Sequence, residues 1–326
     1  MAHDHGSHSH GHSHGDDHGH GQGHNHAHAG GHGHSHAPTD FGARFLWAAA
    51  LNTAFIIAEV IFGLKANSLA LLADAGHNFS DAISLVLSWA AWWLAKRKPG
   101  GNFTYGYRGA SIMAALFNAL LLMVAVGGIV WEAVQRFNSV QPVQGDLVMW
   151  VAGAGILVNG FTAWLFAQGQ SDLNIKAAFA HLAADAVVSA AVVVAGLAMI
   201  FTGWAWLDPA LSIVVSLVIV WGTWGLLRDS VRLSLQGVPP HIDAAKVKAF
   251  LAGLEGVSGV HDLHIWGMST TEVALTVHLI MPAGHPGDDF LRHLAEELSH
   301  HHGIIHATVQ IETGAHACVL ESEEMV

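Results

Sequence analysis

Six stretches of about 20 or more mostly apolar residues constrain the fold of this chain more than any other feature. A helix needs about 20 such residues to cross the hydrocarbon core of a bilayer. Only 12% of all residues are charged, whereas an average soluble domain has about 25%. We therefore expect an α-helical membrane protein with six transmembrane helices and the lipid bilayer as a partner. The stretches cover residues 44–64, 68–95, 109–131, 147–167, 177–206 and 209–227.

The positions of lysine and arginine orient these helices. With both termini on one side of the membrane, eight basic residues near the helix ends fall on that side, and only Lys65 and Arg136 fall on the other. Because cytoplasmic loops carry the excess of Lys and Arg, we expect both termini in the cytoplasm and a bacterial-type inner (plasma) membrane. The eight residues are Arg44, Lys96, Arg97, Lys98, Arg108, Lys176, Arg228 and Arg232.

The pattern divides the chain into a tail (residues 1–40), a membrane domain (41–235) and a C-terminal domain (236–326). The tail is rich in His, Gly and Ser and holds 14 of the 27 histidines. Such a composition cannot bury a core, so we expect disorder. A flexible collector of metal ions is our interpretation of the tail, and a leader whose metal binding is incidental is the alternative.

The C-terminal domain is expected to have a small α+β, ferredoxin-like fold. Apolar residues alternate along 273–281 and leave His278 on the opposite face, which is typical of a half-buried strand. The net charge of −12 argues against nucleic acid as a partner, because nucleic acid selects basic surfaces. We expect helices at 243–254 and 288–300 and strands at 260–266, 273–281 and 307–312.

Only two histidines lie inside the expected membrane helices. His77 and His181 are each followed four residues later by an aspartate, Asp81 and Asp185. Residues four apart share one helix face, so each helix presents an imidazole beside a carboxylate. Two such helices facing each other supply two nitrogen and two oxygen ligands, a set that suits tetrahedral Zn²⁺. The pattern does not separate Zn²⁺ from Co²⁺ or Cd²⁺, whereas an all-carboxylate site would suit Mn²⁺.

Charged residues inside a membrane helix need a reason to persist. An aspartate at the helix centre costs about 2.5–3.5 kcal/mol. A polar clamp, in which His181 bonds Asp81 without any ion, is the competing interpretation. The repeat of one spacing in two separate helices favours metal binding. Asp74, three residues before His77, lies near the same face. Two roles stay open for it: an accessory role beside the metal ion, and a hydrogen bond to a neighbouring helix.

Several motifs resemble the cation diffusion facilitator family. The run from Ser68 to Asp81 (SLALLADAGHNFSD) is similar to the second-helix signature of that family, and residues 104–108 (TYGYR) are similar to its loop before the third helix. His181 and Asp185 match its paired ligands on the fifth helix. The resemblance covers about residues 40–326. It implies a homodimer, a transport site between the second and fifth helices, alternating access, and exchange of metal for protons.

Within the family, the paired His/Asp arrangement resembles the zinc-transporting branch. We therefore expect a divalent transition-metal efflux transporter that exports Zn²⁺ from the cytoplasm as a Zn²⁺/H⁺ antiporter, with Co²⁺ or Cd²⁺ as the alternative substrate. We expect Zn²⁺ both as the transported substrate and as a regulatory ion, and we expect no organic cofactor. The resemblance places a regulatory metal site in the C-terminal domain, at His261, His278, His306 and Glu312.

Three other classes of function compete with this prediction. An intramembrane metalloenzyme needs a general base beside the metal, as in a His-Glu-x-x-His motif, and the sequence contains no such string, so we expect no enzymatic activity. A metal channel is disfavoured because a tight four-ligand site releases ions too slowly for fast conduction. A membrane-bound metal sensor is the remaining alternative.

Overall fold

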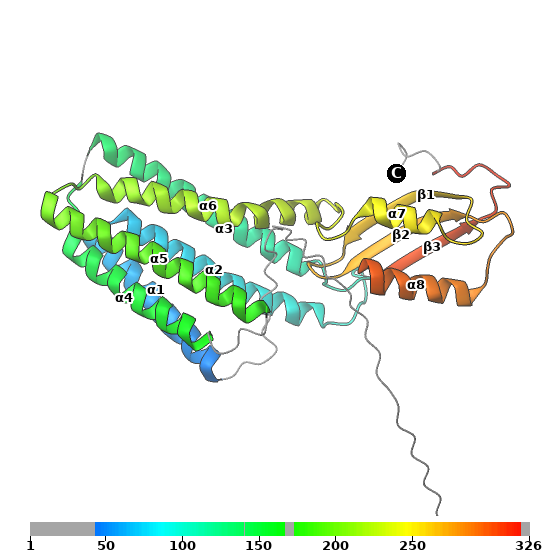
Figure 1. Cartoon of the computed structure of the whole chain (residues 1–326), viewed down its shortest axis with the longest axis horizontal. Coiled ribbons are helices and arrows are strands. Elements are labelled where there is room, and N and C mark those ends of the chain that lie inside the picture. The colour runs from blue at the N-terminus through cyan, green and yellow to red at the C-terminus, as the bar shows by residue number, and fades with distance from the viewer. Residues whose placement is uncertain (1–42, 140, 167–172, 321–326) are drawn as a thin grey trace, which may run out of the picture. The chain divides into compact units, whose positions relative to one another are not determined.

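The computed structural model describes residues 43–139, 141–166 and 173–320, so the predicted tail lies outside the described residues. In the described part, six long helices precede a smaller domain of helices and strands (Figure 1). The six helices are α1 (Ala43–Ala66), α2 (Leu69–Ala95), α3 (Ala110–Asn138), α4 (Gly145–Phe166), α5 (Leu173–Thr202) and α6 (Leu207–Ser234).

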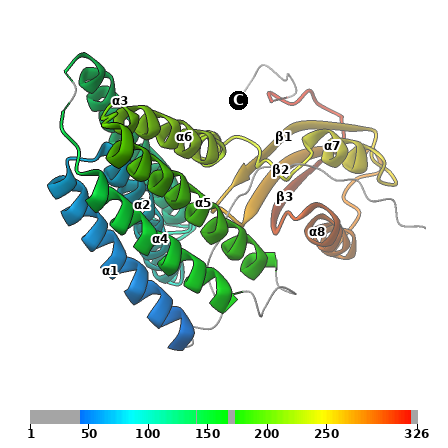
Figure 2. The same ribbon diagram turned by 60° about the vertical axis from the view of Figure 1, so that its left-hand side comes forward.

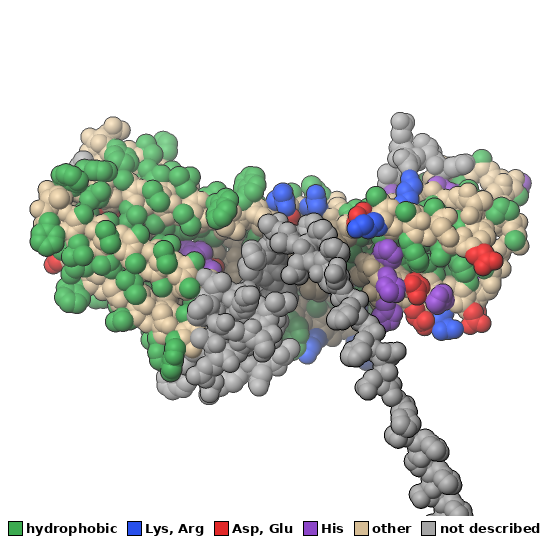
Figure 3. Space-filling view, in the orientation of Figure 1, with side chains coloured by type: hydrophobic (Ala, Val, Ile, Leu, Met, Phe, Trp, Pro, Cys, Tyr) green, Lys and Arg blue, Asp and Glu red, His purple; other side chains and the backbone are tan. Residues whose placement is uncertain are grey.

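Four of these helices are long and apolar enough to cross a membrane. They are α3 and α6 over their whole lengths, Gly145–Trp164 of α4 and His181–Thr202 of α5. The helix α2 is also long but carries Asp74, His77 and Asp81 inside it. Large apolar side chains are exposed over the outside of the helical domain (Figure 3), as a lipid-facing surface requires. The predicted helical membrane domain is confirmed, and the count of six spans stays a prediction.

The helix α2 lies at the centre of the bundle, because it packs against all five of the other long helices (Figure 2). On one flank Leu71 joins a core with Val148 of α4 and Val192 of α5. On another flank Ala73 packs with Leu122 of α3 and with side chains of α6. The central position of α2 brings its polar residues next to α5.

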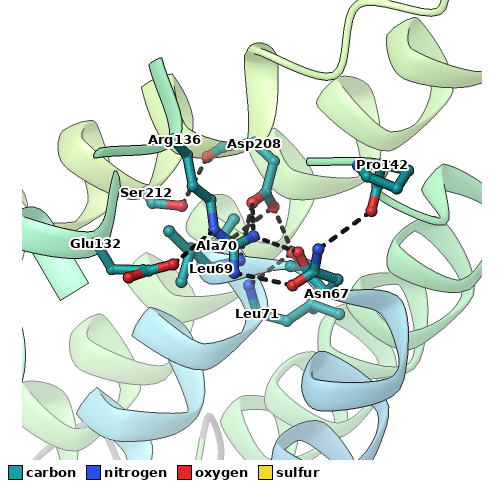
Figure 4. A network of polar contacts seen from close by, with 10 residues as sticks. Asn67, Leu69, Ala70, Leu71, Glu132, Arg136, Pro142, Asp208 and Ser212 are labelled. Carbon is teal, nitrogen blue, oxygen red and sulfur yellow. Dashed lines mark hydrogen bonds and ion pairs between the residues drawn. The ribbon is translucent and has the colours of Figure 1, made fainter. Parts of the chain in front are cut away.

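A polar network holds the start of α2 against α3 and α6 (Figure 4). Asp208 of α6 accepts hydrogen bonds from the Ser68 hydroxyl and from the backbone N–H of Leu69, at 2.8 Å. These bonds satisfy groups that a helix leaves free at its first turn. Arg136 of α3 donates to the carbonyl oxygen (2.6 Å) and the side-chain oxygen (2.9 Å) of Asn67, and its Nη1 lies 3.9 Å from Asp208. The network therefore ties three helices together through buried charges.

The turn between α5 and α6 comes earlier than predicted. The helix α5 ends at Thr202 and α6 begins at Leu207, whereas the expected stretches ended at Trp206 and began at Pro209. Gly203 ends α5 in a left-handed conformation (φ 71°) that favours glycine. Pro209 falls in the first turn of α6, where its missing N–H breaks no helical hydrogen bond.

The C-terminal domain contains two helices and a three-stranded sheet. The sheet order is β1-β2-β3, with β1 antiparallel and β3 parallel to the central β2. The order of elements is that of a ferredoxin-like unit without its first strand. The prediction of a small α+β domain is confirmed. Its elements are α7 (Ala244–Ala252), β1 (Gly259–Gly267), β2 (Val273–Ile280), α8 (Asp288–His302) and β3 (His306–Glu312).

The strand β2 is buried on both faces, which differs from the half-buried strand that the sequence predicted. Leu275 and Leu279 pack into the core with Leu251 of α7 and Leu298 of α8. On the opposite face His278 is also buried, with 9% of its surface exposed. The alternation of apolar residues along β2 predicts which face packs against the helices. It does not predict whether side chains from other elements cover the opposite face.

Candidate metal centres

The paired histidines and aspartates of α2 and α5 lie together in the helical domain. His77 and Asp81 are one turn apart on α2, and His181 and Asp185 are one turn apart on α5. Each side chain offers one ligand atom, and the four atoms all lie within 4.8 Å of one another. Helix geometry supplies each pair, and the packing of α2 against α5 brings the two pairs together.

The separations within this cluster fit a single small ion. His77 Nε2 lies 3.6 Å from an oxygen of Asp81 and 3.5 Å from an oxygen of Asp185. His181 Nε2 lies 2.8 Å from Asp81 Oδ2 and 3.6 Å from Asp185 Oδ2. Ligands of a tetrahedral ion with bonds of about 2 Å are about 3.3 Å apart. The four atoms can therefore surround one ion after small side-chain movements.

The charge of the cluster matches a divalent cation. Two carboxylates carry two negative charges and neutral imidazoles carry none, so a bound divalent ion leaves the set neutral. Neutralisation reduces the cost of burying the ion among apolar helices. The Nδ1 atom of His77 is buried without a hydrogen-bond partner among the described residues. The side chain of Asp185 is 8% exposed and that of His181 is 46% exposed, so the cluster opens on the His181 side.

Asp74, the predicted accessory residue, lies outside the group of four ligands that the described residues form. Its side chain is buried and accepts a hydrogen bond from the Ser189 hydroxyl of α5, at 3.4 Å. On the neighbouring turn, the Asn78 amide donates to the buried carboxylate of Glu59 on α1, at 3.3 Å. These contacts hold α2 against α1 and α5 on either side of His77.

A second cluster lies on the sheet of the C-terminal domain. Its members are His261 of β1, His278 of β2, Glu312 of β3 and Cys318 in the segment after β3, and their ligand atoms lie within 4.8 Å of one another. Glu312 lies 3.3 Å from His261 Nε2 and 3.0 Å from His278 Nδ1. The contact between Glu312 and His261 does not have the geometry of a hydrogen bond. Both ring nitrogens of His261 are therefore buried without a hydrogen-bond partner among the described residues. Buried polar atoms normally have a partner, so these atoms fit a site that takes an ion.

A β-bulge in β1 aims Asp262 at two histidines. The register with β2 shifts between His261 and His264, and Asp262 has a φ of 49°. The Asp262 carboxylate lies 2.9 Å from His264 Nε2 and 3.3 Å from His278 Nε2. A metal-binding histidine usually has its second ring nitrogen held by a carboxylate or carbonyl. Asp262 therefore holds His278 with Nδ1 facing the cluster.

The acidic and thiol members of the second cluster influence each other. Partial burial of Glu312 raises the pKa of its carboxyl group. Hydrogen bonds from Cys318 and Gln310, together with the nearby histidines, outweigh the burial, and the pKa of Glu312 is lowered. A backbone hydrogen bond at Leu320 favours the Cys318 thiolate. Burial and the carboxylates of Glu312 and Asp262 outweigh that bond and raise the pKa of Cys318.

His306, the fourth residue expected in this domain, lies apart from the second cluster. It is exposed at the start of β3, opposite Ala274. It lies six positions before Glu312, which is about 20 Å along a strand. Strand alternation puts both residues on one face of β3, but it does not bring both within reach of one ion. The site expected from the sequence did not include Cys318, although a single cysteine in a histidine-rich domain is a potential ligand.

Comparison with protein families places both domains. Residues 45–233 match the family model described as the cation efflux transmembrane domain. Residues 239–314 match the model described as the cation efflux protein, cytoplasmic domain. The two matches together cover the helices that carry the first cluster and the sheet that carries most of the second.

Curated proteins similar to this chain are metal transporters by name. The zinc transporter ZitB of Escherichia coli is 38% identical over 279 residues, which cover 84% of this chain and 89% of that protein. The cadmium, cobalt and zinc/H(+)-K(+) antiporter of Bacillus subtilis is 35% identical over 81% of this chain and 86% of that protein. The cation efflux system protein CzcD of an Alcaligenes species is 36% identical over 81% of this chain and 84% of that protein.

Proposed function

This chain belongs to the cation efflux family and is a divalent-metal efflux transporter, and from that premise we propose that it exports Zn²⁺ from the cytoplasm in exchange for protons. The observation that carries the proposal is the cluster of His77, Asp81, His181 and Asp185 between α2 and α5. Two imidazoles and two carboxylates suit Zn²⁺ in number, charge and ligand type. The name of the Escherichia coli relative, a zinc transporter, supports the same substrate.

Exchange for protons follows from the chemistry of the ligands. A histidine must be neutral to bind a metal, so binding expels any proton that the imidazole carried. The ordinary pKa of histidine, about 6.5, places this competition near physiological pH. Metal and protons then occupy one cluster in turn, as antiport requires. The name of the Bacillus subtilis relative, a cadmium, cobalt and zinc/H(+)-K(+) antiporter, supports this step.

Co²⁺ and Cd²⁺ are the alternative substrates. Both accept imidazole and carboxylate ligands, and the name of the Bacillus subtilis relative includes cadmium, cobalt and zinc. A metal channel or a membrane metal sensor would use similar ligands but would not couple metal movement to protons.

The working arrangement that we propose is a homodimer in a bacterial-type inner membrane. In it α1 to α6 all span the membrane, both termini are cytoplasmic, and the tail collects metal ions. Removal of residues 236–326 is expected to weaken dimerisation and to lower transport without abolishing metal binding at the α2–α5 cluster. A truncated protein that dimerises and transports like the full chain would contradict the proposed role of the C-terminal domain.

That domain also carries the proposed regulatory metal site, with His261, His278 and Glu312 as its ligands. The unpartnered ring nitrogens of His261 and the Asp262-held ring of His278 support it. Bound there, Zn²⁺ would supply a fixed positive charge that links three strands. His306 is left out of the proposal because of its position at the far end of β3.

Transport by purified protein in sealed vesicles tests the proposed function. Vesicles that enclose a pH-sensitive dye should report a proton flux when Zn²⁺ is added, and the flux should reverse with the zinc gradient. The Asp185→Ala protein is the matched control. Zinc movement without proton movement would indicate a channel, and zinc binding without either movement would indicate a sensor.

A further inference from the structure

Cys318 is the only cysteine of the chain, and it is the one member of the second cluster that lies outside the sheet. Its Sγ atom lies 3.6 Å from Nδ1 of His278. Sulfur and nitrogen ligands of a tetrahedral zinc ion, with bonds of about 2.3 and 2.0 Å, are about 3.5 Å apart. The cysteine is thus already at the separation that a shared ion requires.

We propose that Cys318 is the fourth ligand of the cytoplasmic-domain metal site, and that metal binding there fastens the segment after β3 onto the sheet. The inference rests on the proposed site at His261, His278 and Glu312. Those three residues come from three adjacent strands and leave one position of a tetrahedron to be filled. Cys318 fills it from a segment that is not part of the sheet.

Gln310 is another polar side chain near this position, but its contacts indicate that it is not a metal ligand. It lies opposite His278 in the register of β2 and β3. Its amide nitrogen donates to Glu312 Oε1 at 2.8 Å. An amide binds a metal through its oxygen, whereas the atom of Gln310 that faces Glu312 is the amide nitrogen, so Gln310 orients the carboxylate. The thiolate of Cys318 is also the softer ligand and suits Zn²⁺ and Cd²⁺ better than an amide oxygen does.

The consequence for the chain lies in residues 313–320. They form no helix or strand, so few backbone hydrogen bonds hold them. A metal–thiolate bond at Cys318 would be the strongest link between this segment and the sheet. The thiolate also distinguishes the two clusters: the α2–α5 cluster has only nitrogen and oxygen ligands, so the cytoplasmic site should favour Cd²⁺ more strongly.

Cobalt absorption of the full-length protein tests the assignment directly. A thiolate bound to Co²⁺ gives a sulfur-to-metal charge-transfer band in the near ultraviolet, which imidazole and carboxylate ligands do not give. Because the chain has a single cysteine, any such band comes from Cys318, whatever the histidine-rich tail binds. The band should be present in the natural protein and absent from Cys318→Ser and His278→Ala. It should persist in His306→Ala and in Asp81→Ala.

The cobalt spectrum distinguishes two cases: a metal site without Cys318 as a ligand, and no metal site in the C-terminal domain. Visible cobalt bands that disappear in His278→Ala, without a charge-transfer band, would overturn the role of Cys318 and keep the site. The absence of any cobalt absorption that depends on His278 would overturn both. A charge-transfer band that survives in His278→Ala would place the thiolate on a different metal site and overturn the inference.

Alkylation of the sole cysteine gives a second measurement, made first on the natural protein. A metal-bound thiolate reacts slowly with iodoacetamide, and intact mass reports modification of the sole cysteine. At a zinc concentration ten times the dissociation constant, about a tenth of the sites are free, so the rate should fall roughly tenfold. The same protection should appear in His306→Ala and be lost in His261→Ala. Equal rates with and without zinc would contradict the proposal.

Discussion

His181 Nε2 of α5 lies 2.8 Å from Asp81 Oδ2 of α2, a direct contact between residues 100 positions apart in the chain. The same aspartate oxygen lies 3.6 Å from Nε2 of His77, its neighbour on α2. Asp81 therefore contacts both imidazoles of the cluster, and Asp185 does the same from α5. Each carboxylate links the two helices as well as supplying negative charge for an ion.

The first prediction concerns these two carboxylates. Asp81→Ala or Asp185→Ala removes an anionic ligand, so zinc transport should fall to the background of empty vesicles. Folding should survive, because loss of a charged group inside the membrane does not burden insertion. Zinc uptake and size-exclusion profiles measure the two effects. Asp146→Ala, at an exposed position in the first turn of α4, is the control and should transport normally.

The second prediction concerns ligand type. His77→Asp exchanges a nitrogen ligand for a harder oxygen, so discrimination for Zn²⁺ over Mn²⁺ or Cd²⁺ should change rather than vanish, with the preference moving toward the harder Mn²⁺. The pH dependence of uptake should move to lower pH, because a carboxyl of ordinary pKa about 3.9 replaces an imidazole of about 6.5. Uptake of each ion between pH 6 and 8 checks both. Unchanged selectivity would remove His77 from the ion-binding set.

The third prediction separates Asp74 from the ligands. Asp74→Asn keeps an oxygen that can accept the hydrogen bond from Ser189. A single hydrogen bond is worth about 0.5–1.5 kcal/mol, so the half-saturating zinc concentration should change by less than about tenfold. Asp81→Asn should lose transport in the same assay. An equal loss in both proteins would make Asp74 a ligand of the ion.

The fourth prediction concerns the network that anchors α2. Arg136→Ala leaves Asp208 buried without its counter-charge, and breaking a buried pair costs about 3–5 kcal/mol. The protein in detergent should therefore unfold at a clearly lower temperature. Arg228→Ala is the matched control, since its side chain is 64% exposed and an exposed pair contributes about 0–1 kcal/mol. Equal melting temperatures in the two variants would mean that the network does not stabilise the bundle.

The fifth prediction concerns the histidine-rich tail. A collector works by raising the local metal concentration, so its effect should be largest when free zinc is scarce. Deletion of residues 2–38 should raise the half-saturating zinc concentration and leave maximal flux nearly unchanged. Flux curves measured from low to saturating zinc test this. Superimposable curves at low zinc would show that transport does not use the tail.

Some features of the protein follow from local sequence because helix and strand geometry is local. Apolar stretches of spanning length predicted the helical membrane domain, and α+β periodicities predicted the C-terminal domain. The four-residue spacing of His77 and Asp81, and of His181 and Asp185, placed each pair on one helix face by helix geometry alone. Boundaries were less certain, as the α5–α6 turn shows, because tryptophans are compatible with both a helix end and a turn.

Tertiary packing decided which of these residues meet. Only the packing of α2 against α5 brings the two pairs within reach of one ion. His306 and Cys318 show the same limit in the C-terminal domain: alternation gave the face of β3 but not the distance along it, and Cys318 lies in a segment without any periodicity. The pairing of Arg136 with Asp208 joins helices that are distant in sequence. The spacing of residues in the sequence predicts which face of its own helix or strand a side chain occupies. The side chain that it contacts on another element depends on how whole helices and strands pack.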